Sequence, residues 1–351
     1  MKFIQHFLLL ALLSILGQTP NAVGAQSSAL SPHSQLDDAL RRVQIGDYLG
    51  ARIMAQRFLL YTQDRTVAYR ANYITGISWE MSNQCSPALV AYDNARKYAD
   101  TLEQNNDTWF RSGECLGTLG DYQEAVTHLR NIQDLSRPSD KSKKRIVTAI
   151  LKLRKRSNWW TRWRLRRAIS KPKDADPTFY LAKGHVVLAH DDILRADKLR
   201  IEGRQRKMKR ALKKRAKLVS SAEQHTVATV TLKEPEWILE GLLTLAYASE
   251  SAGDALLLSP MPELSSEQEQ AYRDIIGNRV ESMWTRSVAY LDEGSALAQK
   301  TQWRSPRVNQ LQLARTMLIQ RIDLGPWQKT PPALNFNARR GTMVSQNQVY
   351  D

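Results

Sequence analysis

The residues that come closest to a metal-binding pattern are His185, His190, Asp191 and Asp192. Imidazole and carboxylate groups bind divalent cations. Two ligands on one helix share a face at spacings of three or four residues, and the two histidines stand five apart. We therefore expect no metal site here, and we interpret 190–192 as a turn between two helices.

Other patterns that would carry chemistry are absent from the sequence. No stretch matches the spacings that zinc hydrolases, nucleophilic serines, phosphate loops or dinucleotide-binding turns require. Catalytic groups can also meet in space from distant positions, so this absence removes support for an enzyme without ruling one out. We expect a protein that binds partners, is not an enzyme, and uses no cofactor or metal ion.

Small residues recur at a fixed period. Ala51, Ala88 and Ala125 lie 37 residues apart each time. A second small residue stands twelve positions before each of them, at Ala39, Gly76 and Gly113. Gly184 and Ala196 repeat the gap. Small side chains let two antiparallel helices approach closely, so the pattern predicts a row of helix hairpins, a helical solenoid.

The third copy of this unit resembles the tetratricopeptide repeat (TPR) family. It carries Trp109, Gly113, Gly120, Tyr122 and Ala125 in the order of that family's aromatic, small, turn, tyrosine and alanine positions. The resemblance covers 35–137 well and 177–255 weakly, and Trp237 with Gly241 hints at a further unit. The period of 37 exceeds the family's usual 34, and Asn83 and Cys85 replace the turn glycine and the tyrosine in the second copy.

The resemblance implies an all-α superhelix and a concave groove lined by the first helix of each repeat. A partner segment would bind in that groove. The candidate groove residues that the resemblance suggests are Asn72, Tyr73, Trp79 and Arg111.

The charge of +16 is concentrated in one block. Between Lys141 and Lys217 lie 27 of the 51 Lys and Arg residues but only 6 of the 35 Asp and Glu residues. The flanks are therefore slightly acidic, and the basic character belongs to this block alone.

The first part of the block, 141–170, reads as an amphipathic helix with Ile146, Ile150, Leu153 and Trp160 at helical spacing. Its aromatic and basic residues include Trp159, Trp160, Arg162, Trp163 and Arg164. Such a helix can lie on an anionic membrane, with tryptophan at the headgroup level. The alternative, which we favour for the tryptophan stripe, is packing inside the solenoid with the charged face in solvent.

The second part predicts a helix from about 191 to about 221, roughly 45 Å long at 1.5 Å per residue. Its basic residues are Arg204, Arg206, Lys207, Lys209, Arg210, Lys213 and Lys214. A solvated face and a binding face are equally good interpretations. For a binding face, anionic lipid, an envelope polyanion or an acidic protein fits better than nucleic acid, because the chain begins with an export signal.

That signal consists of Lys2, an apolar run over 7–16 and the small residues Val23, Gly24 and Ala25. The pattern is typical of a cleaved secretory signal and predicts a mature chain from Gln26, exported to a periplasm. No later segment is long and apolar enough to span a membrane. In an oxidising compartment Cys85 and Cys115 form either one disulfide or two separate buried thiols.

Five segments follow from these patterns. They are a signal peptide (1–25), TPR-like repeats (26–138), a basic helical region with a degenerate repeat (139–232), a C-terminal helical region (233–325) and a disordered tail (326–351). We expect an exported scaffold or adaptor that mediates protein–protein interactions in a cell-envelope complex. The alternative is a peripheral binder of an anionic membrane surface or polyanion through 141–217.

Overall fold

The computed structural model describes residues 31–133, 138–170, 177–261 and 264–328, and every regular element in them is a helix. The all-α class is thereby confirmed, whereas the predicted signal peptide and most of the predicted tail lie outside the described residues. The helices of the described part are α2 (Pro32–Gln44), α3 (Tyr48–Leu59), α4 (Arg65–Met81), α5 (Cys85–Lys97), α6 (Leu102–Leu119), α7 (Tyr122–Arg130), α8 (Pro138–Lys155), α9 (Trp159–Ile169), α10 (Thr178–Asp197), α11 (Gln205–Thr231), α12 (Pro235–Leu257), α13 (Ser266–Thr301) and α14 (Pro306–Leu324). None of them combines the length and the apolar composition that crossing a bilayer requires.

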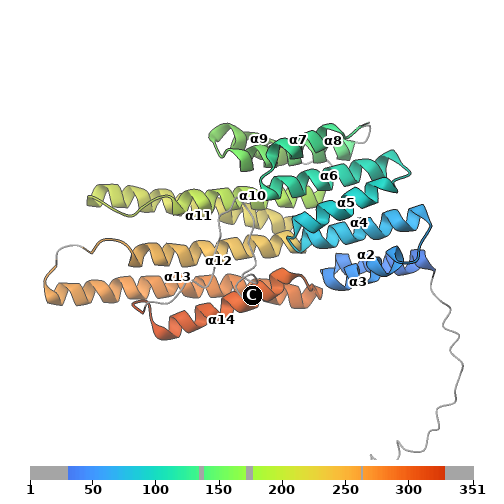
Figure 1. The fold of residues 1–351 in the computed structure, drawn as a ribbon. Coiled ribbons are helices and arrows are strands. Elements are labelled where there is room, and N and C mark those ends of the chain that lie inside the picture. Colours follow the sequence, from blue (N-terminus) through green and yellow to red (C-terminus); the bar gives the residue numbers. More distant parts are fainter. Residues whose placement is uncertain (1–30, 134–137, 171–176, 262–263, 329–351) are drawn as a thin grey trace, which may run out of the picture.

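The helices stack as a row of hairpins (Figure 1). Each helix packs on the next in the chain from α2 to α14. Each even-numbered helix also packs on the next even-numbered one, so α2, α4, α6, α8, α10, α12 and α14 form a continuous inner row. The arrangement has the character of a helical solenoid, in which each unit contacts mainly its neighbours.

The small residues of the first three hairpins sit where helices cross. Ala39, Ala51, Ala88 and Ala125 are fully buried, and a β-carbon added at Gly113 would lie 3.2 Å from the carbonyl oxygen of Ala125. The prediction of close helix pairing at the twelve-residue gap is thus confirmed in these three hairpins. It is wrong for Gly184 and Ala196, which both lie in α10.

Two helix boundaries differ from those predicted. The first part of the basic block forms two helices, because Asn158 caps a new one: its side chain accepts from the Thr161 amide at 3.0 Å and Thr161 returns the bond. Ile146, Ile150 and Leu153 are buried in α8, but Trp160 lies beyond the break and is 60% exposed. The favoured packing of the tryptophan stripe inside the solenoid is therefore wrong.

The predicted turn at 190–192 is also wrong, because α10 continues through it to Asp197. His190, Asp191 and Asp192 are all buried in the middle of this helix. The chain turns instead at 198–204, where Gly203 has a φ of 89°. The following helix, α11, has 27 residues and is about 40 Å long.

The C-terminal part is a long hairpin with a closing helix. A capping box of Ser265 and Gln268 begins α13, which runs for 36 residues. Its fully buried Trp284 centres a core shared with α12 and α14.

The two ends of the row meet. The Arg304 amide, between α13 and α14, donates to the Ile45 carbonyl between α2 and α3 at 2.8 Å. Figure 1 shows the first hairpin beside the C-terminal end of α13. Among the described residues, the loop between α13 and α14 therefore contacts the loop between α2 and α3, which joins the two ends of the row.

Candidate functional site: a basic and aromatic surface

Two of the four candidate groove residues lie together on the inner row. Arg111 of α6 pairs with Glu80 of α4 at 3.1 Å, and Glu80 also accepts from the Tyr92 hydroxyl at 2.6 Å. Tyr73 stacks on Tyr69 with ring centroids 5.6 Å apart, and burial raises the pKa of the Tyr73 phenol. Tyr73 and Arg111 interact directly, so their polar groups are already engaged within the protein.

The other two candidates have different surroundings. Asn72 is buried, and its amide donates to the Ala68 carbonyl of its own helix at 2.8 Å. Trp79 is covered by the guanidinium of Arg52 from α3, 3.8 Å from the ring centroid.

Further buried ion pairs join the inner row. Lys183 of α10 pairs with Glu114 of α6 at 2.6 Å, and Arg307 of α14 pairs with Glu240 of α12 at 2.5 Å. The two members of these pairs are 69 and 67 positions apart in the chain, so no local sequence pattern predicts the contacts. Removing one member of such a pair leaves a buried charge, so these contacts fix the register of the inner row.

The predicted anionic-surface residues of α9 separate into two groups. Trp159, Trp160 and Trp163 are 66%, 60% and 39% exposed, and they pack edge to face with centroids 4.6 and 5.8 Å apart. Arg164 is exposed beside them, as are Arg166 and Arg167. Three clustered tryptophans in solvent are unusual on a protein without a partner for that surface.

Arg162 belongs to the interior and not to this surface. It is 8% exposed and its guanidinium bonds the carboxylates of Asp191 and Asp192 in α10. The expectation that Arg162 contacts an anionic surface is therefore wrong. The helix turns this residue inward, together with Leu165 and Ile169, to anchor α9 on α10.

The basic residues predicted in the second part of the block do lie at the surface. Every one of Arg204, Arg206, Lys207, Lys209, Arg210, Lys213 and Lys214 is exposed. Within the described residues, none of them forms an ion pair with a carboxylate. Arg215 differs, since it is buried and bonds Asp197 at 2.8 Å. The first half of α11 is thus a helix surface of unneutralised cations.

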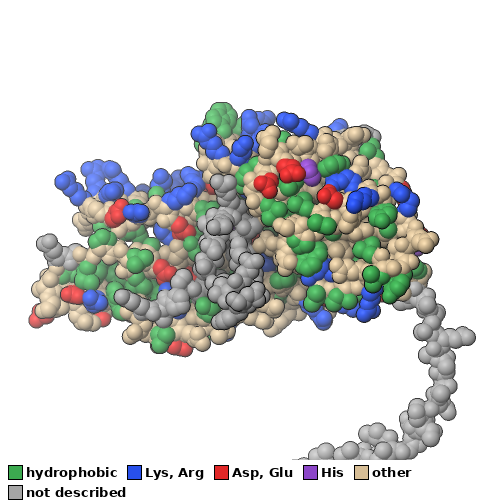
Figure 2. All heavy atoms as spheres, in the orientation of Figure 1, with side chains coloured by type: hydrophobic (Ala, Val, Ile, Leu, Met, Phe, Trp, Pro, Cys, Tyr) green, Lys and Arg blue, Asp and Glu red, His purple; other side chains and the backbone are tan. Residues whose placement is uncertain are grey.

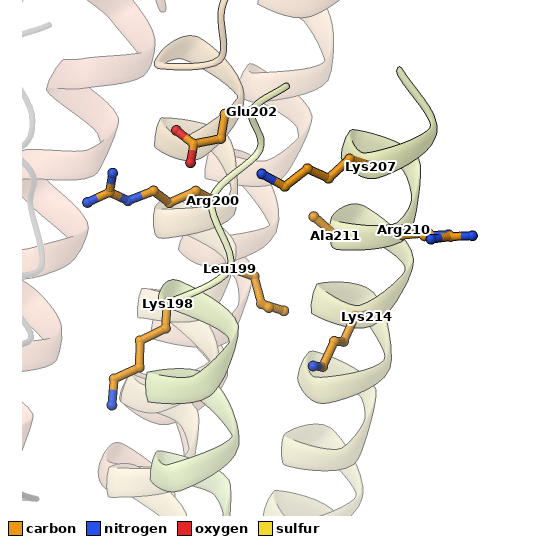
Figure 3. A pocket seen from close by; sticks show the side chains of 8 residues that line it. All are labelled: Lys198, Leu199, Arg200, Glu202, Lys207, Arg210, Ala211 and Lys214. Carbon is orange, nitrogen blue, oxygen red and sulfur yellow. The ribbon is translucent and has the colours of Figure 1, made fainter. Parts of the chain in front are cut away.

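A shallow hollow lies between this half of α11 and the preceding turn (Figure 3). Its volume is about 420 Å³, and its lining is Lys198, Leu199, Arg200, Glu202, Lys207, Arg210, Ala211 and Lys214. Lys207 and Lys214 point across the gap toward the turn, whereas Arg210 points away. Because Lys198 and Arg200 also point away, two ammonium groups face the gap, and they suit a phosphate or carboxylate group.

Figure 2 shows the basic side chains of this end and those around α9 along one outline of the molecule. No acidic residue occurs in 203–222, so nothing on α11 offsets the field there. We call the exposed residues of α9 and 198–217 the basic surface. Its attraction for anions should weaken as salt rises.

The two cysteines meet where α5 packs on α6. Cys85 and Cys115 are both buried as free thiols, and a hydrogen bond between them raises the pKa of Cys115, with burial adding to it. The structure brings the two sulfurs together without a bond between them. For an oxidising compartment, one disulfide and two separate buried thiols stay the two alternatives.

No model of a known protein family matches the chain, and no curated protein matches it.

Proposed function

We propose that the protein is an exported, TPR-like scaffold that attaches to an anionic surface of the cell envelope through its basic surface. The observation that carries this proposal is the row of seven exposed cations at the start of α11, Arg204 at its N-cap and six within the helix, none of which pairs with a carboxylate among the described residues. The exposed tryptophans of α9 support the same assignment, because tryptophan favours the boundary between water and lipid headgroups.

The scaffold part of the proposal is supported by the hairpin architecture. Small residues at the helix crossings and the alternation of inner and outer helices are what a TPR-like array requires. Export is supported by residues 1–25, whose charge, apolar run and small-residue site suit a cleaved signal. The partner within an envelope complex is a protein, and Asn72, Tyr73, Trp79 and Arg111 stay its predicted contacts.

The basic surface is a better candidate than the inner groove for the first contact. The charged side chains of the inner row pair with one another, as Glu80 does with Arg111 and Glu114 with Lys183. A merely solvated helix face would carry both signs, as α13 does with Glu269 and Arg273. The exposed half of α11 carries one sign only, which favours an anionic partner.

Vesicle sedimentation tests the proposal. The protein should sediment with vesicles containing anionic lipid and not with neutral ones, and the bound fraction should fall at high salt. A variant in which Arg206, Lys209, Arg210 and Lys213 become Gln should lose most of this binding. The matched control changes four exposed cations elsewhere, Arg57, Arg130, Arg279 and Lys300, to Gln and should keep it. Equal loss in both variants would mean that net charge, and not this surface, drives association.

A second candidate function is suggested by the outer face of the first hairpin. Leu49 and Ile53 of α3 are 61% and 47% exposed, and Leu60 and Tyr61 after it are 74% and 85% exposed. An apolar strip of this kind suits a protein partner. Crosslinking in the native envelope through a photoreactive residue at position 53, compared with one at exposed Arg130, would test it. Position-specific capture of one protein supports an adaptor role.

A further inference from the structure

Two histidines from neighbouring helices face each other outside the basic surface. The Nδ1 atoms of His185 in α10 and His225 in α11 are 3.1 Å apart, and the ring centroids are 5.4 Å apart. The residues are 40 positions apart in the chain. The sequence spacing pairs His185 only with His190, which lies on another face of the same helix. In the structure the neighbour of His185 is His225, from the next helix.

The backbones that carry the pair are held by close packing. Ala189 of α10 and Ala222 of α11, each within one turn of a histidine, are fully buried in the same apolar cluster. Thr226 and Thr229 beside His225 are buried as well. Both imidazoles are only partly buried. The pair is thus a rigid arrangement that remains open to solvent on one side.

The rings are neutral at pH 7. Burial lowers the pKa of His185, and burial followed by the repulsion from His185 lowers the pKa of His225 to about 4. The charged groups that act on His225 are Asp192, Arg162 and Arg166. One Nδ1–H therefore donates a hydrogen bond to the lone pair of the other Nδ1, and the accepting ring carries its own proton on Nε2.

We propose that His185 and His225 form a two-histidine site for a divalent transition-metal ion, with water in the remaining coordination positions. Metal–imidazole bonds of about 2.0–2.1 Å place two nitrogens about 2.9 Å apart at a right angle and about 3.4 Å apart at a tetrahedral angle. The observed 3.1 Å lies between these limits. The ion therefore needs little movement of either helix.

The proton balance of binding is simple. The ring that holds a proton on Nδ1 transfers it to Nε2 through water, both Nδ1 lone pairs then bind the ion, and no net proton is released at pH 7. Below the pKa of either ring, protons compete with the ion. Arg162 and Arg166 oppose the incoming charge and Asp192 favours it.

The identity of the ion follows from the donors. Within the described part of the chain no third His, Cys, Asp or Glu completes a closed ligand set, so the site is open and exchangeable. Imidazole favours the later first-row ions, and the general order of affinity makes copper(II) the tightest binder, ahead of nickel(II) and zinc(II). Magnesium, which requires oxygen ligands, should not bind.

Titration of the untagged chain with copper(II), followed by calorimetry and electron paramagnetic resonance, tests the site. We expect one ion per chain and a spectrum with coupling to two nitrogens. His185→Ala and His225→Ala should each weaken binding at least tenfold, while His33→Ala and His128→Ala should leave it unchanged. Equal binding in all four variants, or no binding to the parent protein, would show that the pair shares only a hydrogen bond.

A second readout guards against misfolded variants. An ion that bridges α10 and α11 stabilises the folded state, so saturating copper(II) should raise the Tm of the parent protein. The isosteric variant His225→Asn should keep the parent's circular dichroism and lose this rise in Tm. A rise of the same size in His225→Asn would overturn the proposal.

Discussion

Gly46, in the first interhelix turn, lies directly against Ser305, in the last one. A β-carbon at Gly46 would stand 2.7 Å from the Ser305 backbone nitrogen. Gly46 also has a φ of 79°, a conformation that other residues adopt at a cost. The contact between the two ends of the helix row thus depends on a position where only glycine fits without a shift of the backbone.

Gly46→Ala should therefore loosen this contact and lower the free energy of unfolding by about 2–3 kcal/mol, from backbone strain of about 1 kcal/mol and the clash with Ser305. Gly120→Ala is the matched control, because Gly120 also has a positive φ, 99°, but has nothing within 4 Å of a β-carbon. Urea denaturation of both variants separates the cost of the positive φ from the cost of the clash with Ser305. Equal losses would mean that the contact with Ser305 contributes nothing.

Arg162→Ala should destabilise the protein strongly. It leaves the buried carboxylates of Asp191 and Asp192 without their common partner, and breaking a buried pair in this way costs about 3–5 kcal/mol. Arg164→Ala removes an exposed arginine two residues along α9 and should change stability by less than about 0.5 kcal/mol. Thermal unfolding of the two variants measures the contrast, and similar Tm values would contradict the burial of Arg162.

Replacing Trp159, Trp160 and Trp163 together by Ser should change stability little, because all three are exposed surface residues. It should weaken binding to anionic vesicles by about tenfold or more, since each ring loses an interfacial contact. Trp327→Ser is the control, an exposed tryptophan far along the chain at 42% exposure. If vesicles shift the fluorescence of the parent and the triple variant alike, α9 does not touch lipid.

Stability should fall as the solution is acidified through the range in which the histidine pair titrates. The pKa of His225 is lowered to about 4 in the folded chain, whereas an unfolded histidine titrates near 6.5. Between these values the unfolded state binds more protons, so the free energy of unfolding rises with pH there and falls as pH drops. In His225→Gln, the fall in the free energy of unfolding from pH 7 to pH 4.5 should be smaller by about 1–2 kcal/mol. Urea denaturation at both values, with His33→Gln as control, measures it.

Neither cysteine should react with iodoacetamide at pH 8 while the protein is folded. The hydrogen bond from its neighbour and burial raise the pKa of Cys115, so little reactive thiolate exists, and Cys85 is buried as well. Mass spectrometry before and after denaturation measures the labelling. Protein recovered from an oxidising compartment should lack two hydrogens and resist labelling even when denatured, whereas two labels on that material would exclude the disulfide.

The hairpins of the N-terminal third could be predicted from local spacing alone. The two residues of each contact are only twelve positions apart in the chain, as in Ala39 with Ala51 and Gly113 with Ala125. A local sequence pattern therefore predicts the contact. The same holds for the capping box of Ser265 and for the position of the cations on α11. Each depends on one turn or one hairpin, where the chain itself sets the geometry.

The tertiary structure alone decided the rest. The helix α10 continues through Asp191 and Asp192, whose carboxylates Arg162 of α9 neutralises. The contact at Gly46 and the meeting of His185 with His225 join residues from separate hairpins or helices. Such contacts depend on how whole helices stack, which is set by the summed packing of many side chains and leaves no periodic signal at the residues that finally meet.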